Sequence, residues 1–262
     1  MAANLLAPNL IYLFFLIMAR YFGIFLITPI FSSVAILRQV KVVLALLMAV
    51  ITFLLTYQAA NIAAPAHDLE VILYLIKELS IGIFMGFIIY IFFAAIQLAG
   101  QFIDLRMGFR IANVVDPMTG ASSPIIGQFK NIFTILVFLS INGHLMIIKS
   151  LNKSFDIIPL GQVSYDANLW RFLFRRSADL FIIGFKIALP IMGTLFIVDI
   201  MLGFLARAVP QMNIFIIGLP LKILIGFILL ILSFEILVYY FSDILNNGLD
   251  QIIQLINILA PG

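Results

Sequence analysis

Apolar residues follow one another along this chain in long runs that few charged positions interrupt. A bilayer core about 30 Å thick needs about 20 apolar residues in helical form. The runs therefore predict an all-α membrane protein built of hydrophobic helical hairpins. Six segments are long enough, and they cover residues 9–31, 42–60, 70–99, 125–148, 178–206 and 212–245.

Two connectors between these segments are long. Residues 100–124 begin as a polar continuation of a helix and end in Gly, Pro and Ser, a composition that disfavours helix. Residues 149–177 contain a turn at Pro159-Leu160-Gly161 and end in an amphipathic helix that leads into the next apolar segment. We expect the arginines of that helix to contact lipid headgroups rather than a partner; they are Arg171, Arg175 and Arg176.

Composition agrees with the membrane prediction. The chain is 64% hydrophobic and only 10% charged, whereas soluble domains carry about 25% charged residues. The net charge of +3 is too small a basic excess to indicate a nucleic-acid partner, but it suits contact with membrane lipid.

The sequence gives no indication of an enzyme or of a bound cofactor. It lacks Cys, which excludes thiolate metal sites and a Cys nucleophile, and its two His are far apart. It also lacks the G-x-S-x-G, H-E-x-x-H and Walker A motifs. We therefore predict no catalytic residue, no metal and no cofactor.

The most informative stretch is residues 199–222, where two apolar segments meet at a group of polar residues that we call the polar knot: Arg207, Pro210, Gln211 and Asn213. Pro210, Gln211 and Asn213 predict a non-helical turn between two long helices. Asp199 and Lys222 lie inside the flanking apolar runs, where a charge is expensive and usually faces protein or a water-filled path.

The charges of this region allow more than one interpretation. Asp199 and Arg207 are eight residues apart, so they fall on broadly one helix face with Gly203 between them. They form either a polar row facing a pore or another subunit, or an ion pair with neighbours that only fixes packing. Lys222 follows Gly218 and Pro220 near a helix start, where snorkelling is plausible. For Glu235 a buried hydrogen-bonded pair is favoured over a proton relay.

Four motifs carry a resemblance to a known family. The first is Met107-Gly108-Phe109 followed by Asp116-Pro117, Gly120 and Pro124, and the second is Asn142-Gly143-His144-Leu145. The third is Asp199, Gly203 and Arg207 leading into the polar knot, and the fourth runs from Gly218 through Pro220 to Lys222. In this order and spacing, over the whole chain, the motifs resemble the FliR/SctT family of type III export-gate subunits.

The resemblance implies an inner-membrane export-gate subunit in the flagellar basal body. It implies assembly with FliP-like and FliQ-like gate subunits and an FlhB-like subunit, around a pore for unfolded flagellar export substrates. Within the chain it implies a FliP-like helical part at 1–177 and a FliQ-like helical hairpin at 178–262.

The connector near 108–124 has irregular backbone between membrane segments, and such backbone must be buried in protein or line a cavity. The resemblance also gives this connector a role. It implies that this loop plugs the pore of the closed gate; the alternative is a plain solvent-exposed connector. The plug residues would be Gly108, Phe109, Ile111, Val114, Val115, Asp116, Pro117, Met118, Gly120 and Pro124.

Two other functions stay open at this point. One is the export gate of a virulence type III secretion system, which has the same fold and a different cargo. The other is a small-solute secondary transporter, in which Pro210 and Pro220 would interrupt helices around a midplane site. The absence of a visible internal repeat argues against the transporter.

Overall fold

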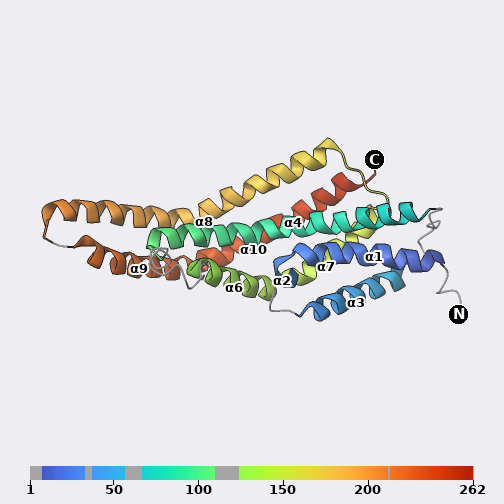
Figure 1. The fold of residues 1–262 in the computed structure, drawn as a ribbon, viewed down its shortest axis with the longest axis horizontal. Helices are drawn as coiled ribbons and strands as arrows, with labels where there is room; N and C mark the ends of the chain where they lie inside the picture. Colours follow the sequence, from blue (N-terminus) through green and yellow to red (C-terminus); the bar gives the residue numbers. More distant parts are fainter. Residues whose placement is uncertain (1–7, 33–36, 57–66, 110–123, 212, 262) are drawn as a thin grey trace. The chain divides into compact units, whose positions relative to one another are not determined.

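The computed structural model describes residues 8–32, 37–56, 67–109, 124–211 and 213–261, and helices are the only regular elements in these ranges (Figure 1). The all-α fold class is therefore confirmed. The helices are α1 (Pro8–Ile27), α2 (Pro29–Ser32), α3 (Arg38–Thr56), α4 (Asp68–Met107), α6 (Ile125–Ser140), α7 (Gly143–Ile157), α8 (Ala167–Ala208), α9 (Ile214–Leu232) and α10 (Phe234–Leu259).

Fewer helices than the six predicted segments can cross a membrane. In the described ranges four helices are long and apolar enough, or five if α6 and α7 count together as one broken span. The predicted segment 212–245 is wrong as a single helix, because the chain breaks at Ser233 between α9 and α10. The Ser233 hydroxyl donates to the Leu230 carbonyl (2.9 Å), which competes with the helical bonding pattern at this point.

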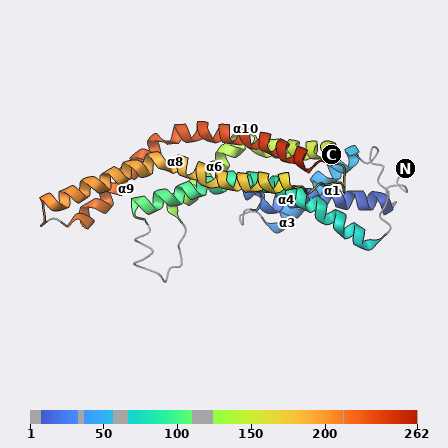
Figure 2. The same cartoon turned by 90° about the horizontal axis from the view of Figure 1, so that it is seen from above.

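Helices α4 and α8 are longer than their predicted segments; each is one continuous helix, and α8 contains Pro190 in its interior (Figures 1 and 2). They contain 40 and 42 residues. At 1.5 Å per residue each is about 60 Å long, twice the thickness of a bilayer core. The polar continuation predicted after residue 99 and the amphipathic helix predicted before residue 178 account for much of the extra length, because polar side chains on one face do not stop a helix.

The start of α8 is fixed by a capping side chain. The Leu169 N–H donates to Asp166 Oδ1 (3.0 Å), and the Asn168 side-chain amide donates to Asp166 Oδ2 (2.8 Å). The first of these bonds is that of an acidic N-cap. The Leu169 N–H lowers the pKa of the Asp166 carboxyl below its usual value. The amphipathic helix predicted before residue 178 is thus the first turns of α8 itself.

The chain forms two compact units. Unit 1 comprises Met1–Ile91, Asn142–Arg176 and Asn246–Gly262, and unit 2 comprises Phe92–Ile141 and Ser177–Leu245. The long helices α4, α8 and α10 contribute residues to both units.

In unit 1, glycines bring α1 and α4 into close contact. A side chain at Gly82 would clash with the Arg20 carbonyl oxygen, and one at Gly23 would clash with the Leu79 carbonyl oxygen. Backbones can approach this closely only where side chains are absent, as in the small-xxx-small pattern of membrane helices. Gly82 and Gly86 form such a pattern, and the structure identifies α1 as its partner.

The interior of unit 1 holds a fully buried ion pair. Arg20 of α1 donates from Nε to Glu78 Oε2 of α4 (2.6 Å), and both side chains are 0% exposed. The other Arg20 nitrogens donate to Ser154 Oγ (3.0 Å) and to the Ile158 carbonyl (3.2 Å). The second Glu78 oxygen accepts the Gly161 N–H (2.7 Å). The network joins α1, α4, the end of α7 and the turn that follows.

The turn predicted at Pro159–Gly161 is confirmed, and Gly161 explains its geometry. Gly161 has φ +78°, a left-handed conformation that glycine adopts without strain. The Tyr74 ring also lies where a side chain at Gly161 would be. The Ser164 N–H then donates to the Leu259 carbonyl (3.0 Å), which attaches this connector to the end of α10.

Unit 2 has a core of its own, in which α4, α6, α8 and α9 meet. Its buried members are Ala99, Ile103, Met107, Ile126, Ala188, Ile191, Leu195 and Leu230. Gly100 of α4 lies so close to the backbone of Gly127 of α6 that a side chain at Gly100 would clash with it. The Asp104 carboxylate accepts the N–H groups of Ile126 (3.0 Å) and Gly127 (3.2 Å), so an acid on α4 caps the start of α6.

The predicted segment 125–148 is also not one helix. The chain leaves α6 at Ile141 and begins α7 at Gly143, and Asn142 between them has φ 59°. Asn is one of the few residues that tolerate this left-handed conformation. The motif Asn142-Gly143-His144 therefore breaks the apolar segment, which continues to Ile157, instead of ending it.

Replacing Arg20 with Met is expected to destabilise the protein by about 3–5 kcal/mol, because Glu78 would be left as an uncompensated buried charge. The double variant R20M/E78M is expected to recover most of this loss, since both charges are removed together. Thermal unfolding of the membrane-extracted protein measures the effect. Arg175→Met, at an exposed position of α8, is the control with little expected change. A double variant no more stable than R20M would contradict the prediction.

Candidate functional site

The charged residues of the 199–222 region form a cluster with a third partner. Asp199 of α8 pairs with Lys222 of α9, and Arg106 near the end of α4 approaches the same carboxylate at 4.0 Å. The three side chains are partly exposed, at 31%, 22% and 40%. The Arg106 guanidinium also lies over the Phe196 ring, 5.7 Å from its centroid. One carboxylate thus faces two cations, and the cluster carries a net positive charge.

The cluster lies at a groove between α8 and α9. The groove has a volume of about 350 Å³ and is lined by Asp199, Leu202, Gly203, Ala206, Ile214, Gly218, Leu219 and Lys222. No atom lies within 4 Å of where a side chain at Gly203 would begin, so the groove is open there. Small residues on its floor would let another helix approach closely. The arrangement suits recognition of a partner helix, with one cationic cluster to fix its position.

The two interpretations of Asp199 can now be compared with its contacts. An ion pair with neighbours is present, and it comes from Lys222 and Arg106. Gly203 shares the groove with Asp199, but Arg207 is not among the groove's lining residues. Arg207 lies exposed in the last turn of α8, where a cation is favourable at the negative end of the helix dipole. Whether the cluster also faces another subunit stays a hypothesis.

The turn predicted at the polar knot is confirmed. Helix α8 ends at Ala208 and α9 begins at Ile214, with Pro210 and Gln211 exposed in the turn between them. The Asn213 carbonyl accepts the Ile216 N–H (3.2 Å) at the start of α9. Gly218 packs against Leu202 of α8, and Pro220 lies exposed within α9. The side chain of Glu235 lies outside the described residues.

Both ends of the predicted plug are described, although the plug itself is not. Gly108 has φ +87° and ends α4, and the Phe109 N–H donates back to the Asp104 carbonyl (3.2 Å). The Phe109 ring lies 6.2 Å from that of Phe227, and Pro124 precedes the first residue of α6. The remaining plug residues lie outside the described ranges; they are Ile111, Val114, Val115, Asp116, Pro117, Met118 and Gly120.

Large apolar surfaces remain uncovered on α8 and α9. Only 28% of the apolar window of α8 is buried, and Phe174, Met201 and Phe204 are at least 63% exposed. On α9, Ile216 and Ile231 are about 70% exposed. A soluble monomer rarely exposes apolar surface of this extent, so lipid or protein partners must cover these faces.

Sequence reasoning missed four residues that matter here. Arg106 lies in the predicted connector 100–124 and was not singled out there, and neither were Glu78, Asp104 and Lys130, although these three are at least 98% buried. A signal was present, because each is a charge inside or beside an apolar run, the same argument that selected Asp199. Their partners could not be read from the sequence, since Glu78 pairs 58 residues away.

Asp199→Asn is expected to destabilise the protein more than Lys222→Gln does. Without the carboxylate, Arg106 and Lys222 face each other uncompensated, whereas without Lys222 the carboxylate retains Arg106. The expected cost of Asp199→Asn is about 1 kcal/mol, a modest value because the groups are partly exposed. Thermal unfolding in detergent measures both, with Lys186→Gln on an exposed part of α8 as control. An equal or larger effect of Lys222→Gln would disprove the shared-carboxylate arrangement.

Comparison with known proteins covers nearly the whole chain. Residues 11–248 match the family described as "Bacterial export proteins, family 1". The flagellar biosynthetic protein FliR of Bacillus subtilis (strain 168) is 34% identical over 250 residues, which cover 94% of this chain and 95% of that protein.

Two further relatives have names that indicate different functions, one flagellar biosynthesis and the other surface presentation of antigens. The flagellar biosynthetic protein FliR of Escherichia coli (strain K12) is 31% identical over 252 residues, covering 93% of this chain and 94% of the relative. The surface presentation of antigens protein SpaR of Shigella flexneri is 28% identical over 228 residues, covering 86% and 85%. With the all-α fold of long apolar helices, these matches confirm the resemblance found in the sequence motifs, and the chain belongs to the bacterial export proteins of family 1, the FliR family.

Proposed function

We propose that this chain is a subunit of the inner-membrane export gate of the bacterial flagellum, where it lines and closes the pore for unfolded flagellar proteins. The observation that carries the proposal is similarity along almost the entire chain to proteins named for flagellar biosynthesis. The apolar helices place the chain in the membrane, and the family supplies the export function.

The geometry of the described residues supports the proposal that the chain is part of a larger assembly. Helices about 60 Å long, with faces that this chain alone does not cover, need neighbours along their length. The groove between α8 and α9 offers one contact surface with small residues and a cationic cluster at its side. The neighbours would be FliP-like and FliQ-like gate subunits and an FlhB-like subunit, with lipid covering what remains.

The proposed mechanism involves no covalent chemistry. The chain would act as part of a conduit, in which helices form the wall and a loop forms the closure. Residues 1–177 would then serve as the FliP-like part and residues 178–262 as the FliQ-like hairpin. The energy for transport would come from partners or from the membrane potential.

The virulence alternative rests on a specific observation, the 28% identity to SpaR over 86% of this chain. The flagellar relatives reach 34% identity and cover more of the chain, so the flagellar system is favoured. The two proposals differ only in cargo.

Deleting the gene in its own bacterium is expected to abolish swimming and the appearance of flagellin outside the cell, while flagellin is retained inside. A plasmid copy of the wild-type chain should restore both, and so should the control variant Lys153→Gln, which changes an exposed residue of α7. Motility and immunoblots of cell and medium fractions measure the outcome. Normal motility of the deletion strain, with loss of a different secreted protein, would favour the virulence gate.

Removing four residues of the predicted plug, Asp116 to Thr119, is expected to leave assembly intact and to make the gate leaky, because the closing surface is lost. Uptake of a small impermeant solute would be measured in cells that carry the deletion and all partners. The control replaces the same residues with Gly-Ser-Gly-Ser, which keeps the loop length and removes only the side chains of Asp116 to Thr119. If the deletion assembles and leaks no more than wild type, the loop is a connector.

A further inference from the structure

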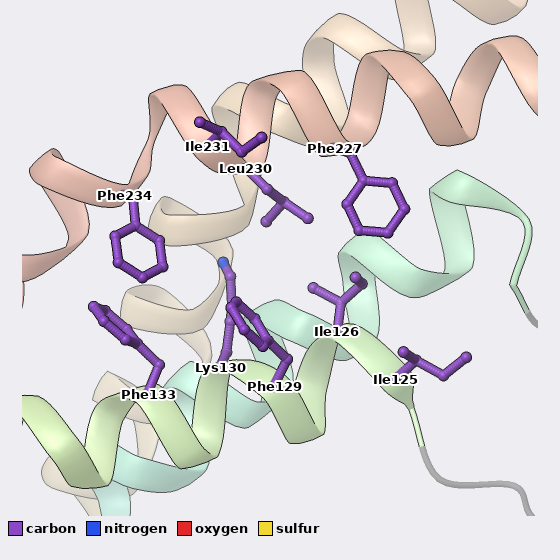
Figure 3. A pocket seen from close by; sticks show the side chains of 9 residues that line it. All are labelled: Ile125, Ile126, Phe129, Lys130, Phe133, Phe227, Leu230, Ile231 and Phe234. Atoms are coloured by element: carbon purple, nitrogen blue, oxygen red, sulfur yellow. The ribbon is translucent and has the colours of Figure 1, made fainter.

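Unit 2 contains an apolar pocket that has no role in the export function proposed above. It lies between α6, the end of α9 and the start of α10 (Figure 3). Its volume is about 240 Å³, and its lining residues are Ile125, Ile126, Phe129, Lys130, Phe133, Phe227, Leu230, Ile231 and Phe234. Four of the nine are phenylalanines, and the Phe133 and Phe234 rings are 3.9 Å apart between centroids.

Lys130 is the exception in this lining, since all the other side chains are apolar. It is 2% exposed, and its Nζ has no hydrogen-bond partner in the described part of the chain. Figure 3 shows the side chain reaching from α6 toward α9, with the nitrogen directed between Leu230 and Phe234. A buried ammonium without a partner is rare, because an unsatisfied charge in an apolar environment is expensive.

The chain itself gives Lys130 little compensation. Asp104 attracts it electrostatically, but both Asp104 oxygens accept N–H groups from Ile126 and Gly127. An anion supplied from outside would therefore give the Lys130 ammonium the partner that it lacks among the described residues.

We propose that this pocket binds an anionic lipid, with the acyl chain along the phenylalanine rings and a headgroup oxyanion on the Lys130 ammonium. Lys130 lies five residues beyond the first residue of α6, about 7.5 Å along the axis, so the charge is close to one helix end rather than at mid-helix. Its four-carbon stem is flexible enough to carry the ammonium to an oxyanion at the mouth.

The size and the rim of the pocket favour a lipid acyl chain over a protein side chain as its occupant. A volume of 240 Å³ is below the range of about 300–1,000 Å³ typical of ligand pockets, which suits one slender chain. Phe129 and Ile231 at the rim are 53% and 72% exposed, so an acyl chain would remain continuous with the apolar surface outside. This proposal does not depend on which cargo the gate exports.

The experiment uses the complete membrane assembly purified through this chain and two diazirine-labelled probes, phosphatidylglycerol and phosphatidylcholine, with the label in the acyl chain. Irradiation followed by peptide mass spectrometry is expected to place the phosphatidylglycerol label on peptides containing Phe129, Phe133 or Phe234. Labelling by the zwitterionic probe should be at least fivefold weaker. A labelled palmitic acid added in a third arm distinguishes a free carboxylate from a phosphate headgroup.

Three variants test the contacts. Lys130→Met keeps the length and removes the charge, and it should reduce labelling at least fivefold, whereas Lys130→Arg should retain it. Ile231→Trp fills the mouth of the pocket at an exposed position, and it should reduce labelling with Lys130 intact. Lys153→Met, exposed on α7, is the matched control and should label as wild type does. If Lys130→Met does not assemble, Ile231→Trp alone decides.

Equal labelling of wild type and Ile231→Trp would overturn the proposal, as would equal labelling by the anionic and zwitterionic probes. A photoreactive phenylalanine analogue at position 129 gives a further outcome. If it captures a peptide of another subunit in place of the lipid probe, a protein side chain occupies the pocket and the lipid proposal is wrong.

Discussion

The buried pair of Arg20 and Glu78 is the interaction on which unit 1 depends. A membrane interior cannot solvate an ion, so both charges are tolerable only because protein groups surround them completely. Ser154, the Ile158 carbonyl and the Gly161 N–H complete the bonding, and the Phe155 ring lies 4.3 Å from the guanidinium carbon. These contacts exist only when α1, α4, α7 and the turn after α7 are all in place. The pair therefore couples segments that hydrophobic contact alone would leave free to slide.

In unit 2 the carboxylates of Asp104 and Asp199 find their partners in two other ways. Asp104 is bonded to backbone: it accepts two N–H groups at the start of α6, where the N-cap residue makes no side-chain hydrogen bond. Asp199 is bonded to side chains, and it holds α8 to α9 through Lys222. Close glycine contacts act alongside these polar links, as at Gly100 and Gly127, where α4 and α6 touch through their backbones. Polar links fix which faces meet, and glycines fix how closely.

The features that could be predicted from the sequence are those that a few neighbouring residues determine. Pro210, Gln211 and Asn213 form a polar group between two long apolar runs, so the turn of the polar knot could be predicted from the sequence, although prolines alone do not end a helix here, as Pro190 and Pro220 show. The count of six spans failed because hydropathy does not register Ser233 or Asn142 as breaks in an otherwise apolar run. Pairings such as Arg20 with Glu78 depend on contacts between distant segments, which no local pattern contains. The interior of the predicted plug lies outside the described residues, so its role rests on the family.

The length of α4 and α8 has a consequence for how such a chain lies in a bilayer. A straight helix of about 60 Å would have to tilt by about 60° to fit a 30 Å core, whereas transmembrane helices tilt by about 0–40°, and in α8 the interior Pro190 allows a bend in place of tilt. The mismatch costs a fraction of a kcal/mol for each ångström that remains uncovered. A copy of this chain alone in plain bilayer would therefore leave part of its long helices in surroundings that do not match them, and neighbours that enclose these helices would remove that mismatch.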